Sequence, residues 1–107
     1  MNNWKPITDS EFNNLFQSQY AELDSTQKNK FNRFRVPFWK ARIRRGKLNA
    51  DEFVFVVAQN KNGVLYFDDV EYGFNISSVD PDGRILTPGG SQNTLKDSID
   101  EWFTGAV

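Results

Sequence analysis

Cysteine and histidine are both absent from this chain of 107 residues. Without cysteine no disulfide framework can form, and without either residue type the usual structural zinc, iron–sulfur and catalytic zinc sites are excluded. Nucleophilic machinery of the Ser-His-Asp and Cys-His kinds is excluded for the same reason. We therefore predict no metal site, no cofactor, no catalytic residues and no enzymatic activity, and we expect the protein to act by binding.

Long apolar runs are missing as well. The first six residues lack the apolar segment of a signal peptide, and no stretch approaches the roughly 20 apolar residues of a membrane-spanning helix. The lack of cysteine also fits a reducing compartment. These features predict a cytoplasmic protein without membrane association.

Aromatic residues, by contrast, are abundant. The chain has 10 Phe, 3 Tyr and 3 Trp, and hydrophobic residues make up 38% of it. This composition is too apolar for a disordered chain. At 107 residues there is room for one hydrophobic core, so we predict a single domain over residues 1–107.

Helical patterns occupy the N-terminal third of the chain. Thr8 and Glu11 have the spacing of a capping box, in which a hydroxyl and a carboxylate satisfy backbone N–H groups at a helix start. A second helix is expected to begin at Asp24 or Ser25 and to end at Pro37, because the residue before a proline is pushed out of the α region. The apolar residues that recur at helical spacing are Phe12, Leu15, Phe16, Tyr20, Leu23, Phe31 and Phe34.

The pattern then changes to a period of two. Residues 38–45 alternate apolar and basic side chains, as in a half-exposed strand. Residues 53–58 are apolar on both faces, which indicates a central strand, and Asn62-Gly63 predicts a type I′ hairpin. Further strands are expected over 64–67, 70–76 and 84–87, with a turn over 80–83.

A last helix is expected after residues 88–90, with Ser91 as its cap and with a buried stripe. We also expect Tyr72 and Phe74 to lie in the core. The order of elements predicts an α+β fold with two N-terminal helices, a mainly antiparallel sheet of four to five strands, and a C-terminal helix packed on it. The stripe of the last helix comprises Leu95, Ile99, Trp102 and Phe103.

Basic residues concentrate between residues 28 and 47, where no acidic residue occurs. Interleaved with aromatic side chains, they suggest a face for single-stranded nucleic acid. A solvated strand face is the simpler interpretation, and a sequence pI near 5.3 argues against a dedicated nucleic-acid binder. The candidate nucleic-acid face consists of Lys40, Arg42, Arg44, Arg45 and Lys47.

Acidic residues dominate the second half of the chain. A calcium loop is disfavoured, because no acidic residue closes the segment that begins at Asp80. Turn chemistry explains several of these carboxylates, whereas a surface that steers a basic protein partner is the functional alternative. The candidate partner-binding carboxylates are Asp68, Asp69, Glu71, Asp80 and Asp82.

The C-terminal half carries a family resemblance. Residues 53–58 (FVFVVA), 66–75 (YFDDVEYGFN), 82–85 (DGRI) and 92–95 (QNTL) follow one another in that order. This half resembles small immunity proteins of polymorphic toxin systems, including those of contact-dependent growth inhibition. The resemblance implies a cytoplasmic antitoxin that binds the toxin domain of its own system, often a nuclease that attacks transfer RNA, and blocks its active site or its access to substrate.

Two hypotheses of different classes follow. The first is a toxin-neutralising protein whose partner is a cognate toxin domain, expected to be a basic nuclease. The second is a nucleic-acid or ribonucleoprotein accessory that uses the basic face at residues 28–47, with an affinity that falls steeply with salt.

Overall fold

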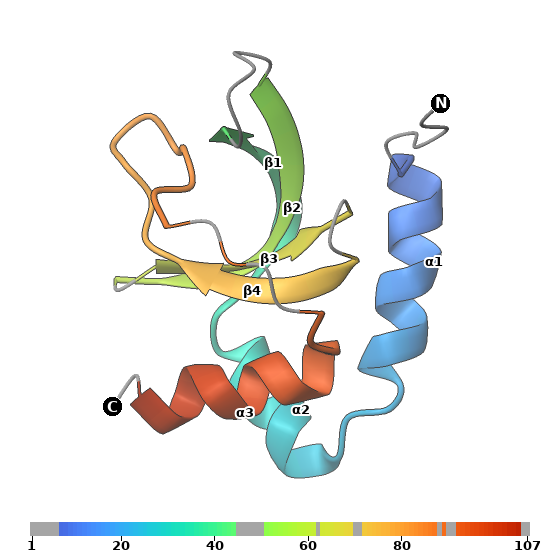
Figure 1. Ribbon diagram of the computed structural model, residues 1–107. Helices are drawn as coiled ribbons and strands as arrows, with labels where there is room; N and C mark the ends of the chain where they lie inside the picture. Colours follow the sequence, from blue (N-terminus) through green and yellow to red (C-terminus); the bar gives the residue numbers. More distant parts are fainter. Residues whose placement is uncertain are drawn as a thin grey trace.

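The computed structural model describes residues 7–44, 51–61, 63–69, 72–87, 89 and 92–105. Two helices come first, then four strands that pair antiparallel in the order β1-β2-β3-β4, and then a third helix. The predicted α+β fold is confirmed (Figure 1). The elements are α1 (Asp9–Tyr20), α2 (Ser25–Asn32), β1 (Arg35–Arg44), β2 (Asp51–Asn60), β3 (Gly63–Asp68), β4 (Gly73–Ser77) and α3 (Leu95–Gly105).

Both N-terminal helices begin at capping boxes. The Thr8 hydroxyl accepts the backbone N–H of Glu11 at 3.1 Å, and the Glu11 carboxylate accepts the N–H of Thr8 at 2.9 Å. Asp24 and Gln27 make the same reciprocal pair at the start of α2. These side chains satisfy N–H groups that have no partner inside a helix, so the chain itself specifies where α1 and α2 start.

Pro37 does not end a helix. Helix α2 stops at Asn32, and Pro37 lies inside β1. β1 is an outer strand of the sheet, and its pairing with β2 shifts register between Arg35 and Trp39. Proline is tolerated at such edges and irregularities because it needs no ladder N–H there. The expected strand start at residue 38 is therefore three residues late.

The β2–β3 turn and the start of the last helix also differ from the predictions. Asn60 pairs with Gly63, so Gly63 belongs to a strand pair of the β2–β3 hairpin rather than to the centre of its turn as predicted; Asn62 lies outside the described residues. Helix α3 begins at Leu95, where the Thr94 hydroxyl accepts the N–H of Asp97 at 3.2 Å. The predicted cap, Ser91, lies outside the described residues.

The apolar side chains divide between two cores rather than one, because the sheet is covered on both faces. Helices pack on one face, and the segment that follows β4 packs on the other (Figure 1, orange). The first core comprises Phe12, Phe16, Leu23, Phe31, Phe55, Val57, Ala58, Leu65, Phe67, Phe74, Leu95, Ile99 and Trp102. The second core comprises Ala41, Ile43, Val54, Val56, Val64, Tyr66 and Ile85.

The segment after β4 closes the second core without forming a fifth strand. Val79 makes an isolated antiparallel bridge to Ile85, and Arg84 makes an isolated parallel bridge to Arg42 of β1. The backbone N–H of Ile85 donates to the carbonyl of Arg42 at 2.9 Å. The segment thus crosses from β4 to the outer edge of β1, and it brings Arg84 beside a strand far away in the sequence.

Candidate interaction surface

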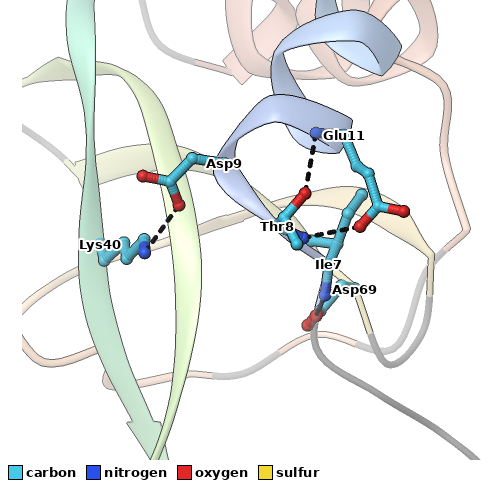
Figure 2. Close-up of polar contacts among 6 residues, drawn as sticks. All are labelled: Ile7, Thr8, Asp9, Glu11, Lys40 and Asp69. Carbon is cyan, nitrogen blue, oxygen red and sulfur yellow. Dashed lines mark hydrogen bonds and ion pairs between the residues drawn. The ribbon is translucent and has the colours of Figure 1, made fainter.

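The predicted acidic set does not form one surface. Asp68 is fully buried, with 0% of its surface exposed, so it is not the surface carboxylate that we expected. The Asp69 carboxylate accepts the backbone N–H of Ile7 at 2.8 Å and thereby ties the segment before α1 to the sheet (Figure 2). Glu71 lies outside the described residues.

The other two carboxylates lie at the opposite end of β4. Asp68 pairs with Gly73 at the start of that strand, whereas Asp80 and Asp82 follow its last residue, Ser77. Five strand residues at about 3.3 Å each separate the two groups by more than about 13 Å. These carboxylates are close in the sequence because the β3–β4 hairpin is short. In the folded chain the hairpin places them at opposite ends of β4.

Asp80 has a clear structural role in its turn. Its Oδ1 accepts the N–H groups of Asp82 and Arg84, both at 2.9 Å, and its carbonyl accepts the N–H of Gly83. Gly83 has φ of 82°, a conformation that glycine adopts without steric cost. The predicted turn is confirmed, and Asp82 remains as an exposed carboxylate at its tip.

The structure describes the side chains of only two of the five candidate basic residues, Lys40 and Arg42. Lys40 and Arg42 are exposed, and both project from the α1 side of β1 because the intervening Ala41 is buried in the second core. The Nζ of Lys40 lies 2.7 Å from Oδ1 of Asp9 (Figure 2). Only the backbone of Arg44 is described, and Arg45 and Lys47 lie outside the described residues.

Exposed aromatic side chains were not anticipated from the sequence. Phe53 is 50% exposed although it belongs to the interior strand β2, and Tyr72, expected in the core, is 61% exposed. Tyr72 has φ of 58°, and its ring meets the edge of the buried Phe67 ring at 5.4 Å. The left-handed turn residue breaks the alternation that had predicted its burial.

Phe53 lies in one row with two arginines, next to Arg42 and one position further from Arg84. In the sheet it pairs with Arg42 of β1, and Arg42 in turn pairs with Arg84. These three residues, here called the Phe53 row, come from three separate chain segments. Their alignment depends on strand register and on a long-range bridge, neither of which can be predicted from a local sequence pattern.

Within the described residues, no group of three or more acidic side chains is placed to hold a metal ion, and no helix has the length and apolarity needed to cross a bilayer. Comparisons of the chain with protein families, with curated proteins and with solved structures give no match.

Proposed function

We propose that this chain is an immunity protein that binds and neutralises the toxin domain of its own system in the cytoplasm. The observation that carries the proposal is the exposure of Phe53 in β2 and of Tyr72 in the turn just before β4. Large aromatic side chains that remain in water are typical anchors of protein–protein interfaces, where their burial contributes much of the binding energy.

The setting of Phe53 supports this role. The five residues that follow it in β2, Val54 to Ala58, are all buried, so the backbone that carries the ring is fixed by both cores. A side chain held in place before binding loses little conformational entropy when it docks. The protein therefore offers a preformed surface, which fits neutralisation by covering a toxin's active site or its approach to substrate.

The partner class follows from the resemblance of the C-terminal half. Toxins of these systems are often nucleases, including enzymes that cleave transfer RNA, and a nuclease domain is the partner that we propose. The protein acts in this proposal by occupying space on the toxin, and it needs no chemistry of its own.

The test is a binding and protection assay with the toxin encoded by the gene directly upstream. Co-expression is expected to rescue cells from that toxin, and the purified proteins are expected to form a stable complex. Phe53→Ala and Tyr72→Ala should each weaken the complex by at least about fivefold, since truncating an interface anchor costs upward of about 1 kcal/mol. Absence of both a complex and protection would end the proposal.

Leu86→Ala is the matched control. Leu86 is 51% exposed, close to the exposure of Phe53, but its backbone N–H bonds to Ser78 beyond the far end of β4 from Tyr72. Truncation of this similarly exposed apolar side chain should leave the affinity unchanged. An equal loss in all three variants would mean that general surface hydrophobicity, rather than the Phe53 and Tyr72 surface, drives association.

A further inference from the structure

The Phe53 row places two arginine side chains next to each other on one face of the sheet. Arg42 lies between Ala41 and Ile43, which are both buried in the second core, so Arg42 projects to the opposite face. Arg84 precedes Ile85, which is buried in the same core, and therefore projects as Arg42 does. Paired residues on neighbouring strands lie about 5 Å apart, and Phe53 flanks Arg42 on its other side.

This arrangement is electrostatically unfavourable by itself. Like charges directly opposite each other on neighbouring strands destabilise a sheet, and neither arginine forms an ion pair with any other side chain that the structure describes. The Nε of Arg84 is buried and has no hydrogen-bond partner among the described residues. A buried donor without an acceptor carries a desolvation cost, and an anion bound between the two guanidinium groups would offset their mutual repulsion.

We infer that the Arg42–Arg84 pair is a receptor for a carboxylate of the protein partner, with Phe53 covering the apolar part of the same segment. The inference rests on the proposed function, because it assigns chemistry to the surface by which the toxin docks. A guanidinium presents its N–H groups as a planar fork that matches a carboxylate. Two such forks side by side can hold one carboxylate between them or two neighbouring acidic side chains.

A carboxylate fits this site better than the phosphates of a nucleic acid. A nucleic-acid strand needs a continuous basic track that follows its backbone. Among the side chains of β1 that the structure describes, the next basic one along this face is Lys40, whose Nζ lies 2.7 Å from Oδ1 of Asp9. The two arginines supply two adjacent planar cations, which match one acidic group or two neighbouring ones.

The first experiment uses a peptide probe and the full chain. Nuclear magnetic resonance titration at low ionic strength with acetyl-tetraglutamate amide is expected to shift the Nε–H signals of Arg42 and Arg84, and acetyl-tetraglutamine amide is expected to leave them in place. Arg42→Gln and Arg84→Gln should each weaken peptide binding at least about tenfold. Lys96→Gln, an exposed cation on α3, should leave peptide binding unchanged.

Two results of this titration would overturn the inference. One is peptide binding that Arg42→Gln and Arg84→Gln leave unaltered. The other is that an eight-nucleotide oligouridylate binds more tightly than the glutamate peptide and that the same two variants abolish this binding. The pair would then be a phosphate site. An Arg42→Lys, Arg84→Lys double variant keeps both charges without the forks, so retention of full peptide affinity would also refute recognition by paired guanidinium groups.

The second experiment measures the same variants against the upstream toxin. The Arg42→Gln, Arg84→Gln double variant should weaken the complex at least about tenfold, with Lys96→Gln as the unaffected control. A complex of undiminished affinity would refute the inference and leave the proposed function standing. Failure of the unmodified protein to bind or protect would refute the proposed function, while the peptide titration still decides the chemistry of the arginine pair.

Discussion

Phe12 shows how a single side chain joins α1 to the sheet. Its ring is fully buried and stacks on Phe55 of β2, with centroids 4.3 Å apart and planes inclined by 12°. It also meets the edge of Phe38 at 5.3 Å and lies 5.5 Å from Phe67. Because three segments of the sheet meet at this one ring, its removal leaves a cavity that no neighbour can fill without moving the backbone.

Phe12→Ala is therefore expected to lower the free energy of unfolding by about 3–5 kcal/mol, the usual cost of a large core truncation. Urea unfolding followed by circular dichroism measures the change. Phe53→Ala serves as the matched truncation at a half-exposed site, where less than about 1 kcal/mol should be lost. Comparable losses in the two variants would contradict the assignment of Phe12 to the core and of Phe53 to the surface.

Arg84 is a residue at which stability and binding are expected to oppose each other. Arg84→Met keeps an unbranched apolar stem but removes the guanidinium group, with its buried, unpartnered Nε and its repulsion with Arg42. We expect this variant to raise the free energy of unfolding by about 1 kcal/mol, since an unsatisfied buried donor costs roughly 1–3 kcal/mol and some packing is lost. Thermal and urea unfolding measure it; a decrease would show that Arg84 stabilises the isolated protein.

At the level of elements, the helix starts are the best example of local specification. The capping box of α1 uses only residues three apart in the sequence, so its spacing could be recognised without knowledge of the fold. The same holds for Asp24 and Gln27 at α2. These short-range signals explain why the starts of the first two helices could be predicted closely.

The capping box of α1 also gives a pH-dependent prediction. The backbone N–H of Thr8 and, second, its hydroxyl lower the pKa of Glu11 below its ordinary value of 4.5 by favouring the charged carboxylate. A carboxyl group with a lowered pKa in the folded state adds stability above its unfolded pKa, and that stability is lost as the pH falls through the folded value. The capping contribution of Glu11 is therefore complete at pH 7 and declines below about pH 4.5.

Thr8→Ala should lower the free energy of unfolding by about 1 kcal/mol at pH 7. Glu11→Gln should destabilise the protein at pH 7 and do so progressively less as the pH falls below 4.5 and the wild-type carboxyl group takes up a proton. Glu22→Gln, an exposed carboxylate between α1 and α2, reports the effect of losing a negative charge outside the box. A Glu11→Gln effect that is independent of pH would contradict the role assigned to the carboxylate.

Elements that depend on distant partners were predicted less well. Pro37 suggested a helix end because its constraint on the preceding residue is local, whereas its tolerance in β1 depends on the edge position of that strand. The alternating pattern predicted that Tyr72 lies in the core. The left-handed backbone at that residue interrupts the extended strand conformation, so the alternation does not hold there. The Phe53 row requires the β1–β2 register and the Arg42–Arg84 bridge, so no window of sequence could reveal it.

On the scale of the whole molecule, the sheet is shared by two cores. β2 contributes Phe55 to the first core and Val54 and Val56 to the second, because successive side chains of a strand point to opposite faces. Neither core can lose its packing without disturbing the strands that support the other. This sharing predicts that both faces unfold in one cooperative step.

Two tryptophans make that cooperativity measurable. Trp39 packs against the second core, where its indole N–H donates to Gln59 at 2.9 Å, and Trp102 lies buried in the first core, 5.8 Å from the Phe34 ring. With Trp4 and one of these two replaced by Phe, the remaining indole reports on a single core. In each variant the fluorescence and circular dichroism transitions in urea should coincide, because the strands that bury the indole also carry the other core. A fluorescence midpoint clearly below the dichroism midpoint in only one variant would show that its core loosens first, and the sheet would then not couple the two faces.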